Sequence, residues 1–409
     1  MNLLPLNADS IPLHKPLPFS LRTPSGVLLA HKGFVVANRA QLDDMIARNG
    51  GLCIDPAESH AYQRAFMGQL DTLVRENRTL GQIANAQFDA IPAADPARPA
   101  PAPSGSGAPA WPDWKEMQVR ATAVLRLPND AGFLDKVARL HEELVHWARL
   151  RPDAVLFALI HTTLRSMRMY SATHAMLVCV MCDIAARQVL RWPEAEVQSL
   201  GRAALTMNVS MTEMQDYLAL QAEPASEWQL SAIGQHAKRS QEILTSLGVD
   251  DPLWIGAIEQ HHTKDTGSLA AMDPARRLAQ VIERADVFSA RMSPRNSRES
   301  LSSTMAMQAS YLDHNKKVDE AGSAMIKAMG LYPPGSFVRL ASGEVAVVLR
   351  RGASATSPKV AAVLNRDGMP MGVAVTRDTS QAAYKVVASV AQHDVRIELQ
   401  LTRMLQLIG

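Results

Sequence analysis

The middle of the chain, residues 114–330, repeats its apolar positions every three or four residues, which is the spacing of helices that bury one face. One such stripe is formed by Phe133, Val137, Leu140 and Leu144. Two later helices are predicted to begin where a proline follows an aspartate, at Asp251-Pro252 and at Asp273-Pro274, because aspartate caps a helix and proline fits its first turn. This region is therefore predicted to be all-α.

The start of the chain follows another pattern. Short apolar runs at Phe19–Arg22, Val27–Ala30 and Phe34–Val36 are separated by turns that contain glycine, which is typical of small β structures. Asn38 can cap a short helix that follows them, and another helix is expected at about residues 57–87. The segment is predicted to be a small β-rich module followed by a helix.

The last part of the chain returns to β-branched runs with glycine- or serine-containing turns between them. Four strands are predicted, at Ser336–Leu340, Glu344–Leu349, Lys359–Leu364 and Met371–Val375. Residues 397–408 fit either a last strand or a helical turn. A short β appendage is therefore predicted to follow the helices.

A tract rich in proline, alanine, glycine and serine at residues 89–113 is predicted to be a semi-extended linker, since it offers little to bury. The predicted organisation is a β-rich N-terminal module with a helix at 1–88, this linker, an α-helical domain at 114–330 and a β-rich C-terminal appendage at 331–409. The fold class is thus multi-domain and mainly α.

Composition excludes some functions. The 409 residues are 47% hydrophobic, which is enough for a sizeable core. The 42 basic and 40 acidic residues nearly cancel, so neither a nucleic-acid surface nor a polybasic membrane patch is predicted. The most apolar stretch, Ala175–Ala186, carries Asp183 and is too short to span a bilayer, and the proline-broken start is unlike a signal peptide. We expect a cytoplasmic protein without a membrane span.

Three cysteines do not make a disulfide framework. Cys179 and Cys182 lie three residues apart in a predicted helix, with no second cysteine pair nearby. They are interpreted as buried core thiols in preference to a redox or zinc site.

Several histidines fall in the helical region, and a single histidine on a helix is usually a packed residue. The adjacent pair His261-His262 ends an apolar helix and leads into a polar loop. Such a pair either reaches a metal ion or is favoured at that position by the helix dipole. The pair alone leaves both interpretations open.

The order of other polar residues along the chain favours the interpretation that this pair reaches a metal ion. Along the chain come His174, Met207-Asn208, His236, His261-His262, Asp286, and then Arg295 and Arg298. This order and spacing resembles the HD-GYP family, a branch of the HD-domain phosphohydrolases, over about residues 165–330. The resemblance implies a central helical bundle of the HD type, in which two or three iron or manganese ions serve the hydrolysis of cyclic di-GMP.

The resemblance also implies roles for single residues. His174 falls at the first ligand histidine of the family, and His236, His261 and His262 fall at the later ones. Asp286 falls at the final carboxylate ligand. These five are the expected metal-binding residues.

Arg295 and Arg298 match the two arginines of the family's arginine-containing element. An anionic phosphate is expected beside them, because guanidinium groups bind phosphate with paired, charge-assisted hydrogen bonds. The resemblance therefore implies that they bind the ligand, cyclic di-GMP.

The chain departs from the family at its central pair. Met207 and Asn208 stand where the family has histidine and aspartate, and Met211 stands at the lysine that follows. The family's aspartate bridges two metal ions, whereas Asn208 offers only a neutral carbonyl oxygen, and a thioether suits neither Fe²⁺ nor Mn²⁺. No binuclear centre is expected, because two neighbouring cations would repel each other without the bridge.

Two further features of the family are absent. Its His-His-Glu sequence continues here with Thr263, and residues 266–269, Thr-Gly-Ser-Leu, replace the Gly-Tyr-Pro loop that contributes to substrate recognition. The three later histidines can still hold one ion of iron, manganese or zinc. His174 and Asp286 are left without the partner that they share in the family.

Three functions remain open. A degenerate HD-GYP-like signalling protein would bind cyclic di-GMP or a protein partner without efficient hydrolysis. An active, metal-dependent cyclic di-GMP phosphodiesterase would need a rearranged metal site, with Asp265 or Glu213 supplying the missing carboxylate. A purely structural helical domain would only bind other proteins. We favour the first, with protein partners in signalling, no nucleic acid, and a homodimer as an open option.

Overall fold

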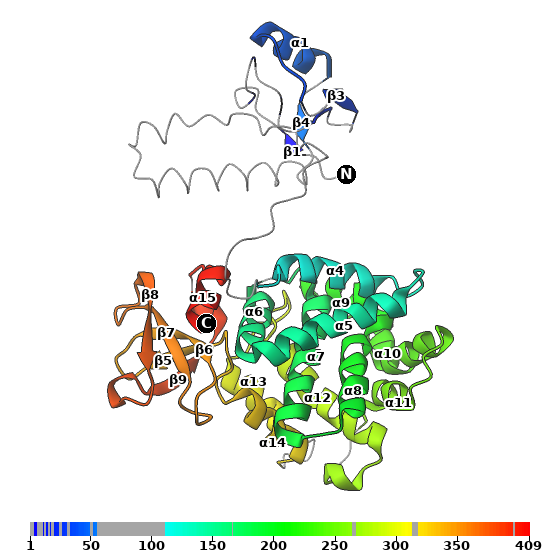
Figure 1. Cartoon of the computed structure of the whole chain (residues 1–409), viewed down its shortest axis with the longest axis vertical. Coiled ribbons are helices and arrows are strands. Elements are labelled where there is room, and N and C mark those ends of the chain that lie inside the picture. Colours follow the sequence, from blue (N-terminus) through cyan, green and yellow to red (C-terminus); the bar gives the residue numbers. More distant parts are fainter. Residues whose placement is uncertain are drawn as a thin grey trace, which may run out of the picture. The chain divides into compact units, whose positions relative to one another are not determined.

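The computed structural model describes residues 4–5, 11, 14, 17, 20–23, 27–30, 33–49, 52–54 and 111–409, apart from 166, 264–266, 313–317 and 396. It divides into two compact units, Met1–Ala108 and Pro109–Gly409 (Figure 1). The helix predicted at 57–87 and most of the predicted linker lie outside the described residues. The helical region and the β appendage share the second unit.

The first unit contains a small antiparallel sheet of strand order β1-β4-β2-β3. Its elements are β1 (Leu4–Pro5), β2 (Leu21–Arg22), β3 (Leu28–Ala30), α1 (Arg39–Asn49) and β4 (Cys53–Ile54). The predicted helix is confirmed, and its cap is the side chain of Asn38, which accepts a hydrogen bond of 2.9 Å from the backbone N–H of Gln41. The run Phe34–Val36, predicted as a strand, is not among the strands that the structure describes.

The second unit begins with a bundle of helices, as predicted. They are α4 (Trp114–Arg126), α5 (Phe133–Leu150), α6 (Pro152–Arg165), α7 (Tyr170–Ile184), α8 (Glu194–Thr206), α9 (Thr212–Leu220), α10 (Glu227–Ser246), α11 (Pro252–Gln260), α12 (Pro274–Met292), α13 (Ser303–Tyr311) and α14 (Glu320–Met329). The short helices η2 (Ala185–Leu190), η3 (Val209–Met211) and η4 (Leu269–Ala271) join them. The predicted starts of α11 and α12 are confirmed, because Asp251 and Asp273 cap the backbone N–H groups of the following turns.

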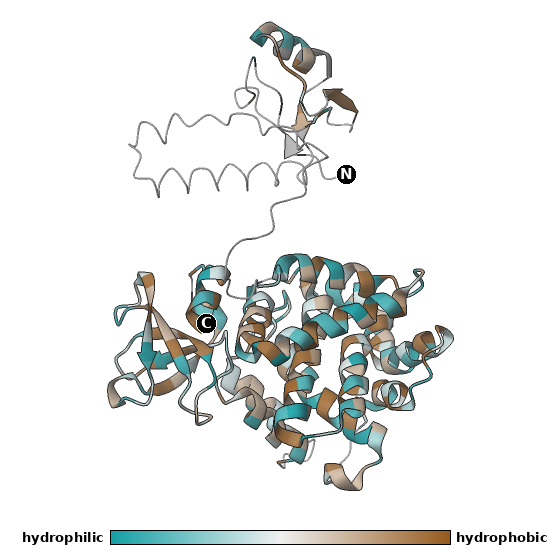
Figure 2. Cartoon of the chain, viewed as in Figure 1, coloured by the Kyte–Doolittle hydropathy of each residue, from teal (hydrophilic) through white to brown (hydrophobic). Residues whose placement is uncertain are grey.

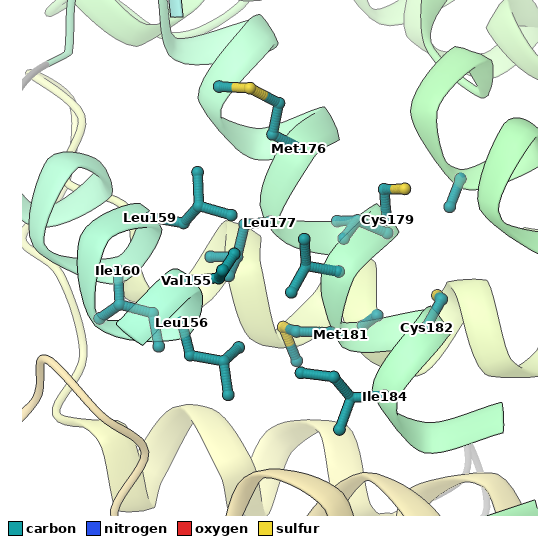
Figure 3. Close-up of a cluster of buried hydrophobic side chains, with 14 of the residues drawn as sticks. Val155, Leu156, Leu159, Ile160, Met176, Leu177, Cys179, Met181, Cys182 and Ile184 are labelled. Atoms are coloured by element: carbon teal, nitrogen blue, oxygen red, sulfur yellow. The ribbon is translucent and has the colours of Figure 1, made fainter. Parts of the chain in front are cut away.

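Helix α7 forms the centre of the bundle. It packs against α4, α5, α6, α8, α9 and α12, and every one of its 15 residues is buried, as the cluster in Figure 3 illustrates. Together with η2 it forms a 21-residue helix, Tyr170–Leu190, which is longer than the predicted apolar stretch and could cross a membrane by length and composition alone. Of its most apolar window, however, 78% is buried inside the protein, which is the behaviour of a core helix. The surrounding helices carry both apolar and polar faces (Figure 2).

Cys179 and Cys182 belong to this core and are both free thiols. Burial raises the pKa of each thiol well above its ordinary value, so neither is poised as a thiolate. The interpretation as core residues agrees with this environment.

The C-terminal part is a five-stranded antiparallel sheet of order β8-β7-β6-β5-β9. Its elements are β5 (Phe337–Leu340), β6 (Val345–Arg350), β7 (Lys359–Leu364), β8 (Pro370–Asp378), η5 (Ala382–Tyr384), β9 (Val386–Val390), η6 (Gln392–Asp394) and α15 (Leu401–Ile408). The four predicted strands are confirmed, and β9 is an additional one. The end of the chain is the helix α15, which packs against α6 and β6.

Candidate functional site

Three histidines meet where α10 lies beside the end of α11. His236 projects from α10, while His261 and His262 follow directly after α11. One ligand nitrogen of each lies within 4.8 Å of the other two. His236 and His261 are buried and His262 is exposed, so the cluster is open on one side.

Hydrogen bonds to the backbone fix the tautomers of the two buried rings. Nδ1 of His236 donates to the carbonyl oxygen of Ile233 at 2.5 Å, and Nδ1 of His261 donates to that of Ile258 at 2.6 Å. The Nε2 atoms then carry lone pairs, and these two atoms face each other at 3.2 Å. Two lone pairs cannot form a hydrogen bond with each other, but both can coordinate one cation.

The geometry of this nitrogen pair suits a transition-metal ion. With metal–nitrogen bonds of about 2.0–2.1 Å, a separation of 3.2 Å between Nε2 of His236 and Nε2 of His261 corresponds to an angle of about 100° at the metal. Burial lowers the pKa of both rings, that of His261 to about 3, with the neighbouring His262 adding to the effect. Both imidazoles are therefore neutral near pH 7, as metal ligation requires.

His174 and Asp286 form a second pair, and Asp286 is close enough to the three clustered histidines to interact with them electrostatically. Nε2 of His174 in α7 lies 2.8 Å from Oδ1 of Asp286 in α12, and Nδ1 lies 2.9 Å from the hydroxyl of Ser289. Burial alone would raise the pKa of Asp286, but its hydrogen bond to His174 and its electrostatic interactions with His174, His262 and His261 hold that pKa well below its ordinary value. Two of the five residues that the resemblance implies as metal ligands are thus in contact with each other.

The segment 207–211, where the resemblance places the family's His-Asp pair and lysine, lies beside the histidines. Met207 is fully buried in the hydrophobic core, whereas Asn208 and Met211 are half-buried. The hydroxyl of Ser210 donates to the carbonyl oxygen of His236 at 2.9 Å, which ties this segment to α10. Met207 serves here as a core side chain.

Arg295 and Arg298 lie on the loop after α12, where their backbones pair with each other. Arg295 stacks over the ring of Tyr170 at 4.9 Å and donates to its hydroxyl at 2.8 Å, and Arg298 donates to the carbonyl oxygen of Ala290. Neither forms an ion pair with a carboxylate among the described residues, and the Nε–H group of each is buried without a partner. Burial lowers the pKa of Arg298, and the charges of Arg295 and Arg291 lower it further. Such uncompensated positive charge favours an anion.

A buried ring joins the two arginines to the His174–Asp286 pair. Tyr170 stands one turn before His174 in α7, and its ring stacks on that of His174 with a centroid distance of 5.6 Å and an interplanar angle of 9°. It therefore lies between Arg295 and His174. Tyr170 and Ser289 were not predicted as site residues. Their only signal in the sequence is that they stand one turn from His174 and from Asp286.

A third residue that was not predicted is Glu283, three residues before Asp286 in α12 and hence near the same face of that helix. Burial raises the pKa of its carboxyl, while the charges of Arg284 and His262 oppose this rise. Of the carboxylates that were considered instead, Glu213 is exposed on α9 and Asp265 lies outside the described residues. Glu283 is thus a half-buried carboxylate whose pKa is influenced by the nearby His262.

No family model matches the chain. It is similar to the cyclic di-GMP phosphodiesterase PA4108 of Pseudomonas aeruginosa, with 25% identity over 217 residues, which are 52% of this chain and 51% of that protein. The chain therefore spans about half the length of the curated relative that it matches. Among solved structures, it overlaps with Bd1817, a HDG"Y"P protein from Bdellovibrio bacteriovorus, with a TM-score of 0.42 and 12% identity, over 80% of this chain and 99% of that one.

Proposed function

We propose that this chain, a divergent member of the HD-GYP family, binds cyclic di-GMP without hydrolysing it efficiently and transmits the bound state to a protein partner. The observation that carries the proposal is the engagement of Asp286. Its carboxylate is held by His174, while the bridging position is occupied by the neutral Asn208. At the family's bridging position, a second metal ion would then meet a neutral amide in place of a carboxylate.

The proposal includes one transition-metal ion at most. His236, His261 and His262 would hold it, since two of their lone pairs already converge and the third ring stands on the open side. Imidazole ligands suit iron and zinc better than manganese, which prefers oxygen ligands. When bound, such an ion supplies positive charge that attracts a phosphate oxygen.

Arg295 and Arg298 are proposed to bind the phosphate groups. Among the described residues no carboxylate forms an ion pair with either arginine, and the buried Nε–H group of each makes no protein hydrogen bond. The ring of Tyr170 holds Arg295 in place. Binding through these groups requires no metal pair.

An active phosphodiesterase with a rearranged site is the second candidate, and Glu283 is the observation that favours it. A carboxylate with a raised pKa near the histidines could share a metal ion in place of the missing aspartate. In that case Glu283→Gln would abolish hydrolysis, whereas in the first proposal there is no efficient hydrolysis to lose.

The test is calorimetric titration of the full chain with cyclic di-GMP, together with chromatography of products after incubation with Mn²⁺ or Fe²⁺ and elemental analysis for metals. We expect binding, at most one metal per chain and no sustained turnover. Arg295→Gln and Arg298→Gln should each weaken binding by about tenfold or more, because a charge-assisted hydrogen bond is lost. Arg366→Gln, at an exposed turn of the appendage, is the matched control. Two metals with linear product formation would overturn the proposal.

Signalling through a protein partner and a cytoplasmic location complete the proposal. Both follow from the sequence expectations, and the buried environment of helix Tyr170–Leu190 supports a core role for it. Co-purification of partners with and without cyclic di-GMP would test the signalling part.

A further inference from the structure

The arginine loop shares a pocket with the C-terminal appendage. The pocket has a volume of about 760 Å³. One wall includes Arg295, Asn296 and Arg298, and the opposite wall includes Gln392, His393 and Glu398, which follow strand β9. The second wall thus comes from a segment outside the region that resembles the HD-GYP family.

Polar contacts hold this second wall against the helical bundle. Arg165, at the end of α6, donates to the carbonyl oxygen of Ile397 and to the carboxylate of Glu398, both at 3.3 Å. The hydroxyls of Ser303 in α13 and Ser389 in β9 lie 3.0 Å apart. The appendage is therefore a fixed part of the pocket.

The anchoring of the appendage is reinforced away from the pocket. Arg351, directly after β6, donates to Asp153 of α6 at 2.6 Å and to the carbonyl oxygen of Ala328 at 2.6 Å. An ion pair that is only partly exposed and reinforced by a backbone contact resists separation of the two parts. A ligand that touches both walls would meet a preformed site.

The two walls differ in chemistry. The arginine wall carries the charges of Arg295 and Arg298 and also the carboxylate of Glu299, but no ion pair joins either arginine to a carboxylate among the described residues, which leaves the guanidinium groups for phosphate. On the other wall, the amide of Gln392 offers both donors and an acceptor, and His393 offers an imidazole that lies 3.5 Å from Glu299. Amides pair with the edges of nucleobases, and imidazole rings stack on them.

The size of the pocket indicates whether a phosphate ion or a larger phosphate-containing molecule fits it. The pocket is widely open to solvent, and its volume is much larger than that of a phosphate ion, so a ligand larger than phosphate can occupy it. A ligand that carries both phosphate and a heterocyclic base matches both walls. This match concerns the two arginines of the proposed phosphate site, not the three clustered histidines, which do not line the pocket, and it rests on the proposed function.

We infer that Gln392 and His393 of the C-terminal appendage form the base-recognising wall of the nucleotide pocket and determine which cyclic dinucleotide binds. The phosphate contacts of the arginine wall are the same for any base. Selectivity for the base is therefore assigned to the appendage.

The experiment measures the dissociation constants of the full chain for cyclic di-GMP and cyclic di-AMP, which share their phosphates and differ in their bases. Wild type is expected to prefer cyclic di-GMP. Gln392→Ala and His393→Ala should each reduce the ratio of the two constants by about fivefold or more, since a base-edge contact is lost. Gln406→Ala, an exposed position of α15, should keep the wild-type ratio.

The outcomes separate the two claims. If wild type binds cyclic di-GMP and both variants retain its ratio, or weaken both ligands equally, the inference about the appendage is overturned while the proposed function stands. If wild type binds neither dinucleotide, the proposed function fails and the inference fails with it. Equal melting temperatures of variants and wild type would show that the comparison is made between folded proteins.

Discussion

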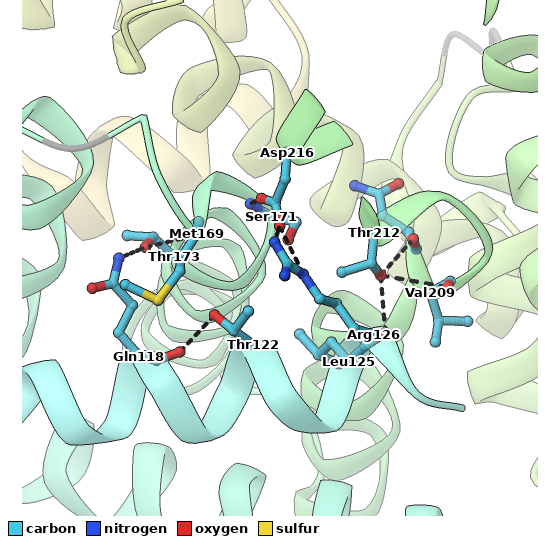
Figure 4. Close-up of polar contacts among 11 residues, drawn as sticks. Gln118, Thr122, Leu125, Arg126, Met169, Ser171, Thr173, Val209, Thr212 and Asp216 are labelled. Carbon is cyan, nitrogen blue, oxygen red and sulfur yellow. Dashed lines mark hydrogen bonds and ion pairs between the residues drawn. The ribbon is translucent and has the colours of Figure 1, made fainter. Parts of the chain in front are cut away.

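Asp216 of α9 accepts two hydrogen bonds from the guanidinium group of Arg126 in α4, at 3.1 Å from Nε and 2.5 Å from Nη2 (Figure 4). Its other oxygen accepts the backbone N–H of Ser171 at 2.7 Å, in the first turn of α7. One carboxylate thus ties α4 to the helix that carries His174. Helix α4 also contacts this helix through Gln118, whose amide donates to the hydroxyl of Thr173 at 2.6 Å.

We expect Arg126→Met to lower the free energy of unfolding by about 1–2 kcal/mol, because it leaves the nearly buried carboxylate of Asp216 without its cation; the partial exposure of Arg126 limits the cost. Urea denaturation provides the measurement. Lys136→Met removes a cation from the more exposed pair with Asp130 and should leave the stability unchanged. Equal effects of both substitutions would contradict the role of Asp216.

Gly201 of α8 lies against the ring of His141 in α5. A Cβ atom at Gly201 would come within 2.2 Å of Nε2 of His141, which is buried. Gly201→Ala is therefore expected to destabilise the protein by about 1–3 kcal/mol. Gly234→Ala, at an open helical position of α10, should instead stabilise it by about 0.5–1 kcal/mol. If thermal or urea unfolding shows that the two substitutions change the free energy of unfolding in opposite directions, the contact is supported. If Gly201→Ala leaves this free energy unchanged, the contact is refuted.

His141 also predicts a dependence of stability on pH. Burial lowers the pKa of its ring to about 4, and Arg202, Arg187 and Arg149 add to this effect while Glu194 opposes it. Between pH 6.5 and 4 the unfolded chain binds a proton at this position and the folded chain does not, so stability falls as the pH falls. The loss across this window is expected to be about 3 kcal/mol.

The variant that tests this is His141→Leu, which removes both buried ring nitrogens that lack hydrogen-bond partners. Its free energy of unfolding, measured by urea titration from pH 7 to pH 4.5, should fall less steeply than that of the wild type. The difference between the two slopes isolates His141 from the other histidines. Parallel curves would show that His141 does not contribute.

The sequence predicted the helical domain well because its signals are local. The apolar stripes, the capping aspartates before α11 and α12 and the alternation in β5 to β8 act within one element, and each was confirmed. Strand β9 was missed, since its neighbour in the sheet is β5, which lies far away in sequence. The resemblance to the HD-GYP family was also visible from the order of landmarks.

The site could be predicted only in part, because its decisive contacts join distant segments. The order of residues along the chain matches His174 and Asp286 to ligand positions of the family. Their mutual hydrogen bond, however, depends on how α7 packs against α12. The stacking of Arg295 on Tyr170 likewise joins positions that are 125 residues apart. The contribution of the C-terminal appendage to a pocket depends on tertiary packing for the same reason.

Restoring the family's pair should restore the capacity for a second metal ion. We expect Met207→His combined with Asn208→Asp to raise the metal content, measured by elemental analysis after equilibration with Mn²⁺, from at most one ion to two per chain. The carboxylate would place negative charge between two cations, which the amide of Asn208 does not. Met207→His alone keeps the neutral amide and should not add the second ion.

The same double variant should change the stability in a metal-dependent way. Met207 is fully buried in the hydrophobic core, so an imidazole at this position is expected to cost about 1–3 kcal/mol in metal-free protein. Added Mn²⁺ should recover part of this loss, because an ion that binds only the folded state stabilises it. A double variant that holds no more metal than wild type, and is not stabilised by Mn²⁺, would show that the neutral Asn208 is not what limits the site to one ion.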